Sequence, residues 1–270
     1  MTTAQRIIKY LALGLAALIV VSIVSGVVAL AASLTGILDG REAPDEELKY
    51  TETFKDAKIT SLEIELDVTN LIVKEGDFAL KTNNSYISWT LDGEILKIKE
   101  KDRNKFFGVD GAYTLELYVP VGTVFNDVEI EAGVGEVSIG ELSCKTLSLE
   151  LGTGRVEIEK LNVSEIADVD GGVGEFTVDS GEVNNLDFEM GVGKADITLA
   201  ISGDSKINGG VGSMSVTLLG NKDGYKLSLA KGIGDISVDG DSVSNNTTLG
   251  DGAAHLTVTG GVGSIEINFK

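Results

Sequence analysis

The segment Gly133-Val-Gly-Glu-Val-Ser-Ile139 is the first copy of a short pattern, G-x-G-x-apolar-x-apolar, that recurs to the end of the chain. Further copies begin at Gly152, Gly172, Gly191, Gly210, Gly232, Gly250 and Gly261, at intervals of 19, 20, 19, 19, 22, 18 and 11 residues. A recurring interval near 20 residues is typical of repeat proteins, in which each unit packs on its neighbours. We therefore predict a repeat architecture.

Each repeat contains two short strands joined by a G-x-G corner. An alternating segment precedes the corner, with an apolar residue three positions before the first glycine: Ile130, Leu149, Val169, Phe188, Ile207 and Leu229. Stacked repeats would align Val137, Val156, Phe176, Ala195, Met214 and Ile236 in one interior column, and Ile139, Ile158, Val178, Ile197, Val216 and Val238 in a second. The pattern predicts a β-solenoid or β-roll of two-strand repeats.

Glycine suits these corners because a sharp bend requires a positive φ or a close backbone approach. The predicted corner glycines are Gly133, Gly135, Gly152, Gly154, Gly172, Gly174, Gly191, Gly193, Gly210, Gly212, Gly232 and Gly234. The last interval is short, so we expect Ala253–Thr259 and Gly263–Phe269 to close the solenoid as an antiparallel hairpin cap.

The residue that follows each G-x-G alternates in charge over the first four copies. These residues are Glu136, Arg155, Glu175 and Lys194. Neighbouring strands lie about 4.8 Å apart, so we predict a ladder of alternating charge on the outer surface.

Apolar residues also alternate before the repeats. They predict strands at Ile59–Leu66, Asn70–Lys74, Phe78–Lys81, Tyr86–Leu91, Ile95–Lys99 and Tyr113–Val119. No window beyond residue 50 shows a helical apolar stripe, so this part of the chain is predicted to be all-β. The expected organisation is an N-terminal β section over 51–125 and the solenoid with its C-terminal cap over 126–270.

Leu11–Leu38 runs for 28 residues without a charged side chain. About 20 apolar residues span a bilayer as a helix, so we predict one transmembrane helix over 11–38. Arg6 and Lys9 place residues 1–10 in the cytoplasm, and a polar linker over 39–50 leads to an extracellular domain of a single-pass protein of the cell membrane. A cleaved signal peptide with its site near Ala29-Leu-Ala31 is the alternative, and it also exports the domain.

Charge and composition exclude several functions. The net charge of the chain is −20, and because residues 1–40 carry +1, the remainder carries −21. Such a surface repels phosphate, so no nucleic acid is expected as a partner. One Cys and one His leave little material for catalysis or metal binding, and we predict no enzyme and no catalytic, cofactor-binding or metal residues. Cys144 is expected to be buried, and His255 to lie on the surface.

The sequence contains one candidate interaction loop, Lys101–Gly111, in which Phe106 and Phe107 are adjacent. The two rings would insert into a membrane surface or the groove of a partner, or one would fold back over the open end of the solenoid. A glycan-cleaving β-helix enzyme is an alternative function. It would require converging carboxylates with Arg or Lys in a groove, and no pair stands out in the sequence.

The stretch Tyr113–Pro120, the strand Asn126–Glu131 and the serial G-x-G corners resemble the bacterial putative-adhesin family of β-strand repeat proteins, which is related to the toast-rack domains of cell-envelope stress proteins. The resemblance covers about residues 50–270. It implies a surface-displayed, non-enzymatic module linked to envelope stress or adhesion, with no functional residues to carry over.

We therefore expect a membrane-anchored extracellular domain for interaction or sensing. Its acidic surface would meet an envelope polymer, a cationic peptide or a neighbouring membrane protein. A structural stalk or scaffold is a further alternative.

Overall fold

The computed structural model describes residues 48–55, 57–101 and 113–270. The predicted membrane segment Leu11–Leu38 and the loop residues Phe106 and Phe107 lie outside these ranges. No helix within them is long and apolar enough to cross a membrane. The described residues all belong to one compact unit.

This unit is built from β-strands, as predicted. They are β1 (Tyr50–Thr53), β2 (Ser61–Leu66), β3 (Thr69–Glu75), β4 (Ala79–Thr82), β5 (Ile87–Asp92), β6 (Ile95–Glu100), β7 (Tyr113–Val119), β8 (Phe125–Asp170), β9 (Val173–Val178), β10 (Gly181–Asn184), β11 (Leu186–Glu189), β12 (Val192–Ser202), β13 (Asp204–Asn208), β14 (Val211–Leu218), β15 (Tyr225–Ala230), β16 (Ile233–Val238), β17 (Asp241–Ser242), β18 (Thr247–Leu249), β19 (Ala254–Thr259) and β20 (Val262–Phe269). One short 3₁₀ turn, Lys222–Gly224, interrupts them. The six strands predicted before residue 120 are confirmed to within two residues at either end.

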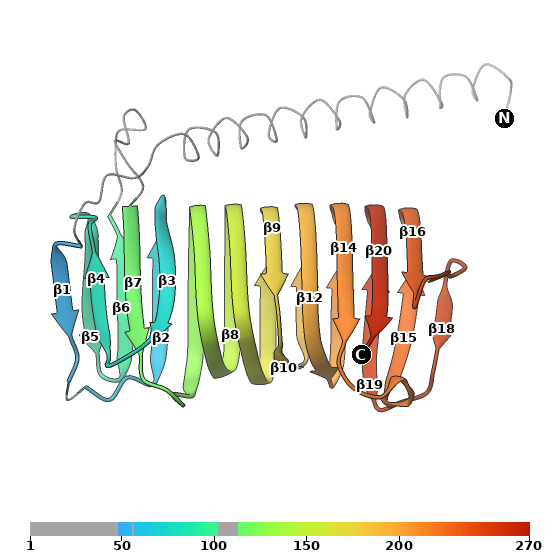
Figure 1. Ribbon diagram of the computed structural model, residues 1–270, viewed down its shortest axis with the longest axis horizontal. Helices are drawn as coiled ribbons and strands as arrows, with labels where there is room; N and C mark the ends of the chain where they lie inside the picture. The colour runs from blue at the N-terminus through green and yellow to red at the C-terminus, as the bar shows by residue number, and fades with distance from the viewer. Residues whose placement is uncertain (1–47, 56, 102–112) are drawn as a thin grey trace, which may run out of the picture. The chain divides into compact units, whose positions relative to one another are not determined.

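The repeats stack as the rungs of a solenoid, which Figure 1 shows as a row of strands. We call the strands that precede a corner the first face and those that follow it the second face. Equivalent strands pair in parallel from rung to rung, for example β12 with β9 and β14. A short third side is an addition to the predicted two-strand repeat, because β10 pairs in parallel with Leu161–Val163 and with Ala200–Ser202.

The strand register confirms both predicted interior columns of the second face up to Met214 and Val216, beyond which Ile265 and Ile267 of β20 precede Ile236 and Val238. Ala195 lies opposite Phe176 on one side and Met214 on the other. Ile197 likewise lies between Val178 and Val216. All of these side chains are buried in one continuous hydrophobic core. Alternation buries every second residue, so the period of 2 in the sequence becomes the inner and outer surfaces of the solenoid.

The second glycine of each corner has a positive φ. The angles are +150° at Gly135, +156° at Gly154, +145° at Gly174, +141° at Gly193, +143° at Gly212, +151° at Gly234 and +138° at Gly263. At Gly212 a Cβ atom would also lie only 1.8 Å from the carbonyl oxygen of Gly193 in the rung beside it. From Gly154 onward, each glycine of this column therefore makes room for the backbone of its neighbour, whereas Gly135 lies against the side chain of Asn70.

The C-terminal rung is not the predicted hairpin cap. β19 pairs in parallel with β13 and β15, and β20 pairs in parallel with β14 and β16. The last strands of the chain are thus inserted between two earlier rungs, and Figure 1 shows β20, in red, between β14 and β16. The prediction was wrong because parallel insertion satisfies both edges of this rung, whereas a terminal hairpin leaves one edge open.

Short antiparallel strands form the cap instead. β17 pairs with β16, and β18 pairs with β15. The predicted copy that begins at Gly250 is not a corner, because Gly250–Ala253 connects β18 to β19. Seven G-x-G corners therefore remain.

The N-terminal end follows the same plan. β2 and β3 lie between the repeats of β8 and the pair β6 and β7, which follow them in the sequence. β5 then covers β6 in antiparallel pairing, and β4 and β1 extend the second face beyond β7. At each end of the solenoid, one rung is held between segments that are not its neighbours in the sequence.

Candidate functional site

The outer surface of the first face carries carboxylates at regular positions. Glu131, Glu150, Asp170 and Glu189 each lie two residues before the first glycine of a corner, and Glu65 faces Glu131 from the next rung. Four more lie two residues earlier on the same strands: Glu63, Glu129, Asp168 and Asp187. We call these nine residues the acidic face.

The register places like charges beside one another. Glu65 lies opposite Glu131, and Asp170 lies opposite Glu189. Parallel rungs repeat at about 4.8 Å, so each carboxylate has another one as its lateral neighbour. Like charges directly opposite one another on a sheet are destabilising. This surface therefore costs the fold stability rather than supplying it.

Basic residues neutralise only the two ends of the acidic face. Lys97 Nζ lies 2.7 Å from Glu63 Oε2, and Lys99 forms an ion pair with Glu65. At the other end, Lys206 Nζ lies 3.3 Å from Asp187 Oδ2. Between these pairs, no described residue forms an ion pair with Glu129, Glu131, Glu150, Asp168 or Glu189. The centre of the acidic face is thus an uncompensated negative surface.

The electrostatic cost is visible at Glu129. Partial desolvation raises the pKa of its carboxyl group above the ordinary value of 4.5, and the charges of Glu63, Glu131, Asp127 and Glu65 raise it further. The folded chain therefore holds this proton more tightly than the unfolded chain does. Ionisation of Glu129 destabilises the fold at neutral pH, and the penalty disappears when the pH falls below the unfolded value.

We expect Glu129→Gln to raise the melting temperature at pH 7 by about 1–4 °C, because it removes one like charge from the acidic face. The gain should shrink as the pH is lowered toward 4, where the native carboxyl is also protonated. Thermal unfolding followed by circular dichroism at several pH values measures both effects. Glu157→Gln is the matched control, since Glu157 lies opposite Thr177 on the second face. An equal gain from the control would refute the explanation.

A hollow of about 500 Å³ borders the acidic face at the corners. Carboxylates line it, together with Leu66, Ala132 and Leu151 and two corner glycines. A second hollow of about 270 Å³ continues along the same face and shares Glu150 and Asp170 with the first. The described residues that line the two hollows include no Lys or Arg, the partners that a glycan-cleaving site would require.

Glu100, which also lines the larger hollow, has a structural role. One of its carboxylate oxygens accepts hydrogen bonds from the backbone N–H groups of Asp67, at 2.9 Å, and Val68, at 3.0 Å. The other accepts a hydrogen bond from Asn84 Nδ2 at 2.8 Å. The corner between β2 and β3 lacks glycine, and this buried side chain satisfies its amides. Sequence reasoning missed it because Glu100 and Asp67 lie 33 residues apart.

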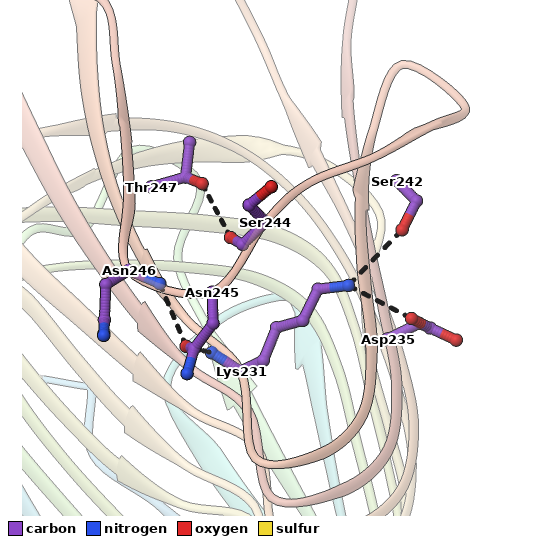
Figure 2. A network of polar contacts seen from close by, with 7 residues as sticks. All are labelled: Lys231, Asp235, Ser242, Ser244, Asn245, Asn246 and Thr247. Carbon is purple, nitrogen blue, oxygen red and sulfur yellow. Dashed lines mark hydrogen bonds and ion pairs between the residues drawn. The ribbon is translucent and has the colours of Figure 1, made fainter.

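A polar network closes the corner at Gly232 in a comparable way (Figure 2). Asn245 Oδ1 accepts hydrogen bonds from the backbone N–H groups of Lys231 and Asn246, both at 2.9 Å. The Lys231 side chain is only 17% exposed, and its Nζ donates to Asp235 Oδ1 and Ser242 Oγ. Hydrogen bonds and an ion pair among its own polar groups thus stabilise the cap.

The second face has a different charge pattern. Glu175 lies opposite both Arg155 and Lys194, as the alternating ladder predicts. Arg155 Nε lies 3.0 Å from Glu175 Oε2, whereas Lys194 pairs with Asp196 on its own strand. Ser213 and Ser264 continue this position without charge. The two faces share one backbone plan, so the concentration of like charge on the first face is a property of its side chains.

The twelve predicted corner glycines lie where the first face passes into the second face, and four of them, Gly133, Gly135, Gly152 and Gly154, lie within the continuous strand β8. Cys144 is buried as predicted, and burial, with a smaller effect of Asp127, raises the pKa of its thiol to about 12. His255 lies at the surface as predicted, with its Nδ1 3.0 Å from Asp204 Oδ1. In the part of the chain that the structure describes, no group of three or more His, Cys, Asp or Glu side chains is arranged to hold a metal ion.

The sequence contained the signal for the acidic face, with a carboxylate two residues before each of the first four corners and four residues before three of them. Sequence reasoning recognised an acidic surface but singled out no residues, because Asp and Glu are abundant throughout. Only the parallel register shows which of them become neighbours.

Solved structures similar to this chain share low sequence identity with it. A putative cell adhesion protein from Clostridium sporogenes is 14% identical, over 82% of this chain and 98% of that chain, with a TM-score of 0.34. A putative adhesin from Bacteroides fragilis is 15% identical, over 81% and 96%, with a TM-score of 0.37. A putative lipid binding protein from Parabacteroides distasonis is 13% identical, over 81% and 96%, with a TM-score of 0.30.

Among curated proteins, none matches the sequence of this chain. The family model described as Toastrack DUF4097 matches residues 59–260, which include the first six of the seven G-x-G corners.

Proposed function

The chain belongs to the Toastrack DUF4097 family, and on this premise we propose that it is a membrane-anchored, extracellular and non-enzymatic interaction domain whose acidic face binds cationic partners. The apolar segment Leu11–Leu38 supports the anchor, and Arg6 and Lys9 before it support an exported domain. Adhesion to, or sensing of, the cell envelope is the role that this arrangement serves.

The observation that carries the proposal is the row of uncompensated carboxylates at the centre of the acidic face. Alternating charge is compatible with this solenoid, because Arg155 and Lys194 flank Glu175 on the second face. A scaffold under selection for stability alone would favour that alternation on both faces. A like-charged row instead attracts and orients ligands of opposite charge. Amino groups of an envelope polymer, a cationic peptide or the basic surface of a membrane protein would satisfy it.

The proposal is tested with the full chain held in nanodiscs of zwitterionic lipid, with empty nanodiscs as the reference. The probe is polylysine, and its affinity is measured at several salt concentrations. We expect binding that weakens steeply between low and physiological salt, as for exposed charges. The triple variant Glu131→Gln, Glu150→Gln, Asp170→Asn should weaken it by about tenfold.

A matched triple variant on the second face, Glu136→Gln, Glu157→Gln, Glu159→Gln, removes the same number of charges. It should change the affinity by less than about twofold if the position of the charge matters. Equal losses from the two triple variants would mean that net charge alone attracts polylysine. Binding that is absent, or insensitive to salt, would reject the proposed function.

A further inference from the structure

The middle residue of each G-x-G corner forms a second continuous row along the solenoid. Val192 lies opposite Val173 and Val211, and Val262 lies opposite Val211 and Ile233. We define the aliphatic ridge by the residues of this row: Val134, Thr153, Val173, Val192, Val211, Val262 and Ile233. Six of the seven side chains are aliphatic, and they stand at the outer apex of successive rungs.

These side chains are not part of the core. Val134 is 40% exposed, Val262 46% and Ile233 76%, and the others are partly exposed. Each has a glycine on both sides in the sequence, so no neighbouring side chain of its own corner covers it. The corner does not require an aliphatic residue, because Thr153 occupies the same position opposite Val173. A contiguous exposed apolar row of this kind is typical of a contact surface.

The aliphatic ridge and the acidic face run side by side. In each of four consecutive rungs, a carboxylate lies three residues before the ridge residue: Glu131 and Val134, Glu150 and Thr153, Asp170 and Val173, Glu189 and Val192. Corner glycines lie between them, and the larger hollow opens there over Gly133 and Gly152. Along these rungs the surface is therefore acidic on one side, bare backbone in the middle and aliphatic on the other side.

We propose that the aliphatic ridge and the acidic face together bind one cationic amphipathic helix, lying along the axis of the solenoid. Rungs repeat at about 4.8 Å and helical turns at about 5.4 Å, so one turn meets one rung over several repeats. An extended strand repeats its side chains at about 6.6 Å and loses this match sooner. Aliphatic side chains of the helix pack on the ridge while its Lys and Arg side chains reach the carboxylates.

Two other occupants fit this surface less well. An anionic bilayer would meet the ridge together with the adjacent carboxylates, and like charges repel. A second copy of this chain would bring an identical acidic row beside the first. The inference rests on the proposed function, since it names the class of cationic partner that the acidic face receives.

The test uses the full chain in zwitterionic nanodiscs and three probes. The first is an 18-residue helix of Leu and Lys with one apolar face, the second has the same composition in an order without an apolar face, and the third is polylysine. Val173→Thr with Val192→Thr removes ridge hydrophobicity while keeping β-branched side chains, as Thr153 already does. Val121→Thr with Val124→Thr is the matched control, at exposed valines away from the corners.

We expect the ridge variant to weaken binding of the amphipathic helix about fivefold to tenfold. Its affinity for polylysine should stay within about twofold of the native value, and the control should change neither. A photocrosslinker on the apolar face of the helix should label the corners of β9 and β12. These results together support the inference.

Suppose that the two Leu and Lys probes bind with equal affinity and that the ridge variant does not change the affinity for the amphipathic helix. That result would overturn the inference and leave the acidic-face proposal standing. Binding of anionic vesicles, or self-association of the chain, that the ridge variant abolishes while helix binding persists would also overturn it. If no probe binds, polylysine included, the proposed function itself fails. Binding of polylysine thus distinguishes failure of the proposed function from failure of the helix-binding inference.

Discussion

Replacing Gly212 by Ala is expected to lower the free energy of unfolding by more than about 3 kcal/mol, or to prevent folding altogether. The φ angle at this position is +143°, which an L-residue with a Cβ atom rarely adopts. The added Cβ would also lie 1.8 Å from the carbonyl oxygen of Gly193. Backbone surrounds the site in the next rung, so the clash is relieved only by separating the two rungs.

Two other glycines allow the cost of backbone strain to be separated from the cost of the clash with the next rung. Gly220 has a φ of +109° with open space around it, so Gly220→Ala measures conformational strain alone, about 1–2 kcal/mol. Gly224 also has open space and no unusual φ, so Gly224→Ala should be close to neutral. Equilibrium unfolding in urea, followed by circular dichroism, ranks the three. If Gly212→Ala cost no more than Gly220→Ala, the close approach between rungs would not limit the corner.

Ile267→Ala should cost about 3 kcal/mol, because β20 lies inside the solenoid and not at its end. Ile267 is fully buried and lies opposite Val216 on one side and Val238 on the other. Its loss therefore leaves a cavity between two rungs as well as removing buried apolar surface. The same urea unfolding experiment measures this loss.

Glu266→Ala on the same strand is the control, since Glu266 is exposed and should change stability by less than about 0.5 kcal/mol. The position of β20 makes the comparison decisive. A terminal hairpin would leave Ile267 covered from one side only, and its truncation would cost about 1 kcal/mol. A loss that small would contradict the inserted rung.

Most local features of the fold could be read from the sequence. Alternating apolar residues identified the strands and the interior columns through Ala195 and Ile197, because a strand exposes its residues with a period of 2. Glycine pairs marked the corners, because few other residues tolerate such a bend. The charge ladder at Arg155 and Glu175 followed from the repeat length alone.

The spatial order of the rungs could not be read in this way. β19 and β20 carry the same pattern as the rungs on either side, so no local signal distinguishes insertion from a terminal position. Their place depends on pairing partners up to 51 residues away, as between Asp204 and His255. Similar repeats can pair in several orders with nearly the same local interactions. The observed order is therefore selected by the free energy of the whole folded chain.

The candidate site, too, was predictable from the sequence only in part. Each carboxylate of the acidic face and each aliphatic residue of the ridge is visible in the sequence, and so is the interval that separates them. Their effect is not visible there, because a carboxylate at a given position of one repeat is an ordinary surface group. Parallel register turns such groups into a row of like charge beside an apolar row, and only that juxtaposition defines a surface for a partner.

The sequence by itself therefore determined the elements of this protein: strands, corners, and which side chains face inward or outward. These properties depend on local steric preference and on the period of 2, which act within a few residues. Only the tertiary structure decided which rung lies beside which, that Glu100 closes a corner without glycine, and that the acidic face and the aliphatic ridge are adjacent. These three features depend on contacts between residues that lie far apart in the sequence, and such contacts form only when the chain folds.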